Sequence, residues 1–286
     1  MTSTAKKILL RLGIALLILG LLTAFEIWEN KSVGITEIEY KNPKIPAGFD
    51  GFRIVQLSDI HSYVISTDHT YFLGRVRQSQ PDIIVITGDL HDTVKKDYFL
   101  TMNLVYGLVE IAPVYFVTGN HECWLGPWEP CMKYLREAGV TLCDDRCVRL
   151  TRGGGAIDMI GVYDPEYLRI ALRDTKGYYT HLRDTRNKAK TDFVILLSHR
   201  PELFERYVNQ GVDLVFTGHA HGGQARIPRL RGFWAPDQGF FPRYTEGVYK
   251  KGKTSMVVSR GLGNNTSVKF RLFNRPEIVA VTLRAK

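Results

Sequence analysis

Five short motifs place side chains that can bind metals directly after apolar segments. The motifs are "LSDIH", "ITGDL", "VTGNHE", "LLSHRP" and "FTGHAH", and each ends a run of aliphatic residues that is typical of a buried strand. Ligands bind outside the carboxyl ends of the strands in open α/β sheets, so we expect these side chains to converge on one site. The candidate metal ligands are Asp59, His61, Asp89, Asn120, His199, His219 and His221.

The types of these donors restrict the metals and the chemistry. Imidazole nitrogens combined with carboxylate and amide oxygens, without thiolates, suit Mn²⁺, Zn²⁺, Fe²⁺/Fe³⁺ or Co²⁺. Seven donors are too many for one tetrahedral ion, but they suit two ions that share a carboxylate. Two such ions can hold both the attacking and the leaving oxygen of an in-line displacement, and they neutralise the charge of a phosphoryl group. The five motifs together therefore predict a two-metal site that hydrolyses phosphoesters or pyrophosphates.

The elements that position these residues are expected to form an α/β protein. Near-continuous runs of β-branched and aliphatic residues predict buried strands, which are expected at 52–58, 82–88, 113–119, 156–162, 192–198, 212–218 and 255–261. Helical patterns lie between several of them, at 70–80, 95–111, 127–138 and 201–209. This alternation indicates α/β layers around a sheet system. The polar segment 168–190 is expected to be a helix-loop insertion on the surface.

The N-terminus predicts a membrane anchor. Lys6, Lys7 and Arg11 precede an apolar stretch at 12–25, and Glu26 and Glu29 follow it. We favour an uncleaved signal anchor, with a cleaved signal peptide and an amphipathic surface helix as alternatives. The charge bias predicts a single-pass protein of the cell membrane whose globular part lies outside the cytoplasm.

We accordingly divide the chain into three parts. Residues 1–30 are the anchor, 31–51 are a linker and an edge strand, and 52–286 are the catalytic domain.

Charge and aromatic residues point to an anionic, amphiphilic partner. The net charge of +9 favours phosphorylated substrates, acidic lipid surfaces or nucleic acid. The segment 224–244 interleaves arginines with aromatic residues, and it supplies three candidate substrate-binding residues, Arg226, Arg229 and Trp234. Such a segment could seat a phosphorylated amphiphile, enter a membrane interface, stack nucleic-acid bases, or merely cover a small core of its own. His91 is expected to be exposed to solvent rather than to line the site.

The order and spacing of "DIH … GDL … GNHE … SH … GHAH" resemble the calcineurin-like metallophosphoesterase family, from about residue 52 to the C-terminus. The form "GHAHGGQ", the anchor and the late "SRGLG" are similar to its bacterial membrane-associated branch. The resemblance implies a four-layer α/β/β/α sandwich of two mixed sheets flanked by helices. It also implies the ligand sets, which are Asp59, His61 and His221 for the first metal, Asn120, His199 and His219 for the second, and Asp89 as the bridge.

The resemblance further implies a catalytic role for His121, which would face the leaving-group oxygen or stabilise the transition state. Glu122 stands where many members carry Asp, which is a small departure from the pattern.

These observations predict a membrane-anchored phosphodiesterase or pyrophosphatase that acts on a lipid-linked or cell-envelope substrate. A UDP-diacylglucosamine-type pyrophosphate and a phospholipid are both compatible with it. The alternatives are a nuclease or a general phosphomonoesterase of the same fold, and a non-catalytic metal-binding scaffold. The anchor disfavours nucleic acid as a partner, and the sequence implies no protein partner.

Overall fold

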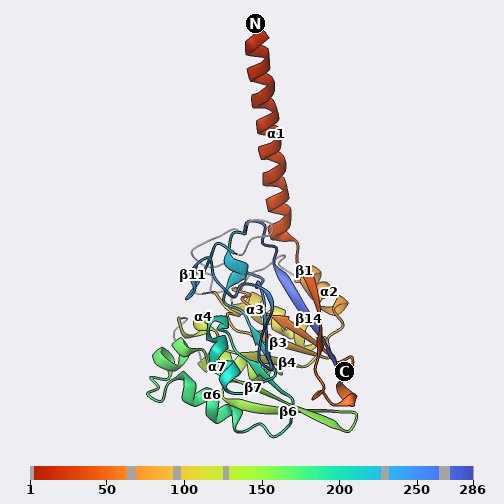
Figure 1. Ribbon diagram of the computed structural model, residues 1–286, viewed down its shortest axis with the longest axis vertical. Helices are drawn as coiled ribbons and strands as arrows, with labels where there is room; N and C mark the ends of the chain where they lie inside the picture. The colour runs from red at the N-terminus through yellow and green to blue at the C-terminus, as the bar shows by residue number, and fades with distance from the viewer. Residues whose placement is uncertain are drawn as a thin grey trace.

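Helix α1 (Ser3–Lys31) projects from one end of the molecule in the computed structural model (Figure 1). The structure describes residues 3–62, 69–92, 98–124, 129–226, 232–263 and 271–285. By length and composition, α1 can cross a membrane, and none of its most apolar stretch is buried inside the protein. A retained anchor and a signal sequence share these properties.

The first sheet carries the strands that follow α1, and the last strand of the chain inserts between the first two of them. Its strand order is β1-β14-β2-β3-β4-β5. The pairings are parallel except for that between β14 and β2. The bounds are β1 (Gly34–Lys41), β2 (Arg53–Leu57), β3 (Ile83–Thr87), β4 (Val114–Val117), β5 (Thr141–Leu142) and β14 (Glu277–Arg284).

The second sheet is also mixed. Its order is β12-β13-β9-β8-β7-β6, with antiparallel pairs at both edges and parallel pairs between them. The bounds are β6 (Arg146–Arg152), β7 (Gly155–Gly161), β8 (Val194–Leu197), β9 (Leu214–Thr217), β12 (Gly247–Lys251) and β13 (Thr254–Val258).

Three apolar clusters hold the layers together. Residues from both sheets, such as Val85 and Phe216, pack face to face in one cluster. A second cluster joins the first sheet to α2 (Thr70–Gln78), α3 (Tyr98–Val109) and α5 (Glu129–Glu137). A third joins the second sheet to α6 (Tyr178–Arg186) and α7 (Phe204–Asn209). In the described part of the chain this arrangement is a helix–sheet–sheet–helix sandwich, which confirms the expected fold.

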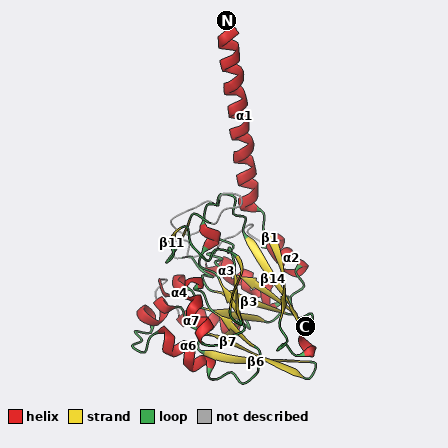
Figure 2. Cartoon of the chain, viewed as in Figure 1, coloured by secondary structure: helices red, strands yellow, loops and turns green. Residues whose placement is uncertain are grey.

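Short elements make up the loops that surround the strand ends. Figure 2 shows β11 among loops at the end of the domain from which α1 projects, with α4 further from that end. The elements are η1 (Ala47–Phe49), α4 (Asn120–Trp124), the π-helical turn η2 (Tyr167–Ala171), η3 (Pro201–Leu203), η4 (His221–Gly223), β10 (Trp234–Ala235) and β11 (Gly239–Phe240).

The apolar runs of the sequence became the strands that bear the functional loops. The seven segments expected to be strands correspond to β2, β3, β4, β7, β8, β9 and β13, two of which, β7 and β13, begin one residue earlier than expected. The predicted insertion at 168–190 contains α6, whose Leu182 is buried against the second sheet. In the segment expected to hold a linker and an edge strand, β1 lies at the sheet edge, and only Ser32 and Val33 separate it from α1.

Candidate metal centre

The candidate ligands lie at adjacent strand ends of both sheets. Asp59 and His61 follow β2, Asp89 follows β3, and Asn120 begins α4 directly after β4. From the second sheet, residue 199 follows β8 and residues 219 and 221 follow β9. All are buried. The two sheets thus bring together the complete set that the sequence predicted.

Strained backbone accompanies this convergence. The ligand candidates with left-handed φ angles between +46° and +63° are Asp59, His61, Asp89, His219 and His221. Non-glycine residues rarely adopt this conformation, and it persists only where surrounding contacts enforce it. Such strain is typical of functional sites, where the chain must turn sharply to aim side chains inward.

The glycines that precede Asn120 and His219 allow the loops to approach one another. A Cβ at Gly119 would lie 2.3 Å from Oδ1 of Asp89, and a Cβ at Gly218 would lie 2.4 Å from Oδ2 of Asp59. Any larger residue would displace a carboxylate of the site. The repeated glycine in the "TGD", "TGN" and "TGH" motifs therefore has a packing reason.

The first group of donors consists of Asp59, His61, Asp89 and His221, whose ligand atoms lie within 4.8 Å of one another. The Nε2 atoms of His61 and His221 are 3.3 Å apart. At this separation one ring can donate an N–H to the other, or both nitrogens can offer their lone pairs to a shared cation. The carboxylate of Asp59 accepts hydrogen bonds from the backbone N–H of His219 at 3.0 and 3.1 Å, which ties the first motif to the last.

The second group consists of Asp89, His199 and His219. Nδ1 of His199 donates to the carbonyl oxygen of Thr87 at 2.7 Å, which leaves its Nε2 directed at Oδ2 of Asp89, 3.2 Å away. The buried Oδ1 of Asn120 has no hydrogen-bond partner among the described residues. An unpaired buried amide oxygen is costly unless it binds a ligand, so the residues fit a second ion. Asp89 belongs to both groups.

Burial sets the protonation of most of these histidines. It lowers the pKa of His61 to about 3 and that of His219 to about 4, and it holds the pKa of His221 well below its usual value. A neutral imidazole offers the lone pair that a metal needs. Burial acts in the same direction on His199, but the carboxylate of Asp89 outweighs it and raises the pKa of His199 to about 10. Metal binding here would therefore displace a proton.

Glu122 shapes the loop that carries Asp89. Its buried carboxylate accepts the backbone N–H groups of Asp89 and Leu90 at 2.9 Å and that of Gly119 at 2.6 Å. The longer side chain that departs from the family pattern therefore has a defined structural task.

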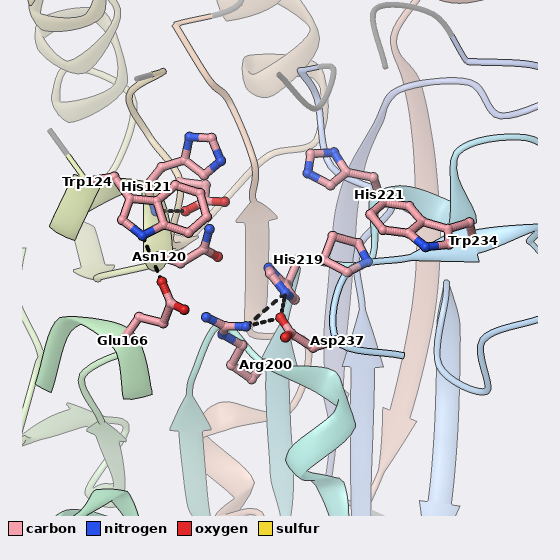
Figure 3. Close-up of a pocket in the computed structure, with 11 residues that line it drawn as sticks. Asn120, His121, Trp124, Glu166, Arg200, His219, His221, Trp234 and Asp237 are labelled. Carbon is pink, nitrogen blue, oxygen red and sulfur yellow. Dashed lines mark hydrogen bonds and ion pairs between the residues drawn. The ribbon is translucent and has the colours of Figure 1, made fainter. Parts of the chain in front are cut away.

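A pocket of about 330 Å³ opens over these donors, within the usual size range for small-molecule sites. Trp124 and His121 line one side of it, and Trp234 and His221 line the other (Figure 3). The indole N–H of Trp124 donates to Glu166 at 2.7 Å. The ring centroid of His121 lies 4.4 Å from that of His61. His121 and Trp234 thus occupy the site that the sequence assigned to them.

Arg200 lines this pocket and was missed by the sequence reasoning. Its buried guanidinium binds both carboxylate oxygens of Asp164, at 2.5 and 3.1 Å, and its Nη1 also contacts Asp237. A fixed guanidinium beside the donors is suited to a phosphoryl oxygen. The signal in the sequence was its place directly after His199. Asp237, in the turn of the β10–β11 hairpin, was also missed.

Three further residues that the sequence analysis discussed, Arg226, Arg229 and His91, do not lie where it placed them or lie outside the described residues. Arg226 is not among the residues that line the pocket; it donates to the carbonyl oxygen of Gly222 at 2.9 Å and contacts Glu246. Arg229 lies outside the described residues. The expectation that His91 is exposed was wrong, because it is buried beside Tyr98.

Comparison with known proteins agrees with this geometry. The family described as calcineurin-like phosphoesterase matches residues 52–223. The uncharacterized metallophosphoesterase YkuE of Bacillus subtilis is 33% identical over 90% of this chain and 87% of its own length. An uncharacterized metallophosphoesterase of Aquifex aeolicus is 29% identical over 93% of this chain and 97% of its own length. A zebrafish relative, 26% identical over 87% of this chain and 57% of its own, is named a transmembrane protein with metallophosphoesterase domain.

A solved structure extends the comparison to the fold. The NAD nucleotidase of Haemophilus influenzae superposes with a TM-score of 0.50 at 16% identity. The match covers 74% of this chain and 45% of that one, so it concerns the fold alone.

Proposed function

This chain belongs to the calcineurin-like phosphoesterase family of metal-dependent phosphoester hydrolases, and we propose that it is a membrane-anchored phosphodiesterase or pyrophosphatase with two metal ions. The observation that carries this proposal is the position of Asp89, which belongs to both donor groups beneath one pocket. One carboxylate shared by two sets of donors is the arrangement that a dinuclear centre requires.

Each donor has a role in this proposal. Asp59, His61 and His221 hold one ion, Asn120, His199 and His219 hold the other, and Asp89 serves both. The bound ions, which are Mn²⁺, Zn²⁺, Fe²⁺/Fe³⁺ or Co²⁺, would supply Lewis acidity to the phosphoryl group.

The remaining chemistry falls to side chains of the pocket. His121 lies beside the first donor group and can donate a proton to the leaving oxygen. Arg200, held by Asp164 and Asp237, places its positive charge beside the donors, where it can attract a phosphoryl oxygen. Trp124 and Trp234 form apolar walls on the two sides, which suits a substrate with an organic group on each side of the phosphorus.

We further propose that the substrate is lipid-linked or part of the cell envelope. Helix α1 makes specific contacts with the catalytic domain at its last turns, which supports its retention as an anchor. Lys6, Lys7 and Arg11 on one side of the apolar stretch and Glu26 and Glu29 on the other favour a domain outside the cytoplasm.

A panel of substrates tests the reaction class. The purified full chain, supplied with Mn²⁺, would be compared on an aryl phosphomonoester, an aryl phosphodiester, a UDP-linked lipid, a phospholipid and single-stranded DNA. We expect turnover of the diester and of at least one lipid, with little of the DNA. Turnover of DNA alone would establish the nuclease alternative, and metal binding without any turnover would establish the scaffold.

Reporter fusions test the location separately. A C-terminal reporter that is active only outside the cytoplasm should give signal, and one that is active only inside should not. Signal from the cytoplasmic reporter alone would contradict the proposed topology.

A further inference from the structure

The end of α1 is locked to the catalytic domain rather than linked to it flexibly. Asn30 and Arg271 exchange hydrogen bonds, from Asn30 Nδ2 to the carbonyl oxygen at 2.7 Å and from the Arg271 N–H to Oδ1 at 2.8 Å. The rings of Phe25 and Phe273 are 6.1 Å apart. The guanidinium of Arg275 lies 5.3 Å from the ring centre of Trp28. A membrane surface near Phe25 and Trp28 must therefore lie close to the domain itself.

Hydrogen-bonded segments run from this junction to the β10–β11 hairpin. The N–H of Arg226 donates to the carbonyl oxygen of Leu272 at 2.8 Å. The N–H of Phe233 donates to Ala225 at 2.8 Å, and that of Phe241 donates to Phe233 at 2.9 Å. Position 241 is thus three hydrogen-bonded steps from Leu272, and neighbouring extended segments are about 4.8 Å apart. In Figure 1, β11 likewise lies toward the end of the domain that carries α1.

Three phenylalanines on this hairpin form an exposed cluster, which we call the aromatic cap. Phe233, Phe240 and Phe241 are 49%, 66% and 73% exposed. The ring of Phe233 lies 5.3 Å from that of Phe240 and 5.8 Å from that of Phe241. Single exposed apolar residues are ordinary, but three large rings gathered around Phe233 mark an interaction surface. Arg243 is exposed two residues further along the chain.

The same hairpin borders the pocket. Trp234, Pro236 and Asp237 line it, next to the donors of the second metal group. A partner that covers the aromatic cap therefore sits at the entrance to the metal centre.

We propose that the aromatic cap inserts into the lipid bilayer that holds α1, so that the pocket opens at the membrane surface. The bilayer is the partner because the locked helix holds it at the end of the domain toward which β11 lies (Figure 1). Phenylalanine rings suit the boundary between head groups and acyl chains, and an adjacent arginine suits anionic head groups. This inference rests on the proposed function in one respect, the retention of α1 in a membrane, and it deepens that function by having the substrate enter from the bilayer.

Spin labels on the full chain in vesicles of phosphatidylethanolamine and phosphatidylglycerol test the inference directly. Among the described cysteines, Cys123, Cys131 and Cys143 are buried free thiols, and Cys147 is partly exposed. The Cys147→Ser variant therefore removes the accessible native thiol, and each label is introduced into that variant. A label is introduced by Phe241→Cys. Leu17→Cys, within the apolar part of α1, gives the reference for a site inside the bilayer. Thr151→Cys is exposed on β6, at the end of the domain remote from α1 in Figure 1, and gives the reference for water.

At position 241 we expect relaxation by oxygen to exceed relaxation by a water-soluble nickel chelate, as at position 17, with the opposite order at position 151. A label at 241 that behaves like the one at 151 overturns the inference. Spin–spin broadening at 241 that disappears when the protein is diluted in lipid would show that a second copy of the chain covers the cap in place of the bilayer. That result also overturns the inference. Since the measurement needs no turnover, failure of the substrate panel would leave this result intact.

Discussion

The carboxylate of Asp237 lies 2.7 Å from Nε2 of His219, so the turn of the β10–β11 hairpin holds a candidate metal ligand in place. Partners of this kind orient the imidazole and raise its basicity, and their loss typically costs 10–100-fold in metal affinity. We expect Asp237→Asn to weaken metal binding toward the lower end of that range, because half of the carboxylate is exposed. Titration of the protein with Mn²⁺ or Zn²⁺ against a competing chelator measures the effect. Asp184→Asn, on the exposed face of α6, is the matched control, and equal affinities in the two variants would contradict the role.

Asp89→Asn should lose metal and activity together. Its carboxylate lies between His199 and His61, at 3.2 and 3.7 Å, and one neutral amide oxygen cannot serve two cations. Metal content by elemental analysis and turnover of an aryl diester would be measured on the same sample. Near-normal metal content with full turnover would refute the shared position.

His121→Ala should keep the metals and lose rate. The side chain lines the pocket but lies outside both donor groups. Proton donation to a leaving group is typically worth 10²–10⁴-fold, so the loss should be large for alkoxide leaving groups and small for nitrophenolate. Rates on both kinds of diester, together with metal content, separate the possibilities. An equal loss on both substrates would indicate stabilisation of charge instead of proton transfer.

The double variant Phe240→Ser/Phe241→Ser should raise KM for a lipid substrate presented in vesicles. Burial of a phenylalanine side chain contributes about 1.5–3 kcal/mol when it is complete, and partial insertion contributes less. A small soluble diester does not contact the exposed rings and should be cleaved at the parent rate. If both substrates are affected equally, the hairpin serves only to hold Trp234 and Asp237 in the pocket.

Asp158→Asn should destabilise the fold far from the chemistry. Burial alone would raise the pKa of Asp158, but Arg149 and the backbone N–H groups of Lys190 and Thr191 donate to it and lower that pKa to about 2. A carboxyl of this kind stabilises the folded state above its unfolded pKa of about 4, and the stabilisation is lost as the pH falls toward 2.

At neutral pH the Asp158→Asn variant should lose about 1–3 kcal/mol of unfolding free energy, because the donors around this buried position lose their ionised acceptor. Urea unfolding at pH 7 and at pH 3 measures the free energy of unfolding of the variant and of the parent protein. We expect the two proteins to differ less at pH 3. A difference that does not depend on pH would show that the charge of Asp158 contributes nothing.

The strands and most of the candidate metal centre were predictable from the sequence because they depend on local pattern. A buried parallel strand is a continuous apolar run, and the residues that follow it lie at the carboxyl edge wherever the strand is placed in the sheet. Asp59, Asp89 and His219 could therefore be assigned to one site before their strand order was known. The motif spacing also predicted the family.

Tertiary structure alone decided which residues support that centre and where it faces. Arg200 and Asp164 are 36 positions apart, and Asp237 meets His219 across an 18-residue separation that no periodicity marks. His91 was misjudged because burial depends on helix α3 packing over it. The lock between Asn30 and Arg271 spans 241 positions. Contacts between residues so far apart in the sequence form only when whole layers pack together. The free energy that stabilises this packing comes from burying many side chains at once, and the conformational preference of a single segment does not determine it.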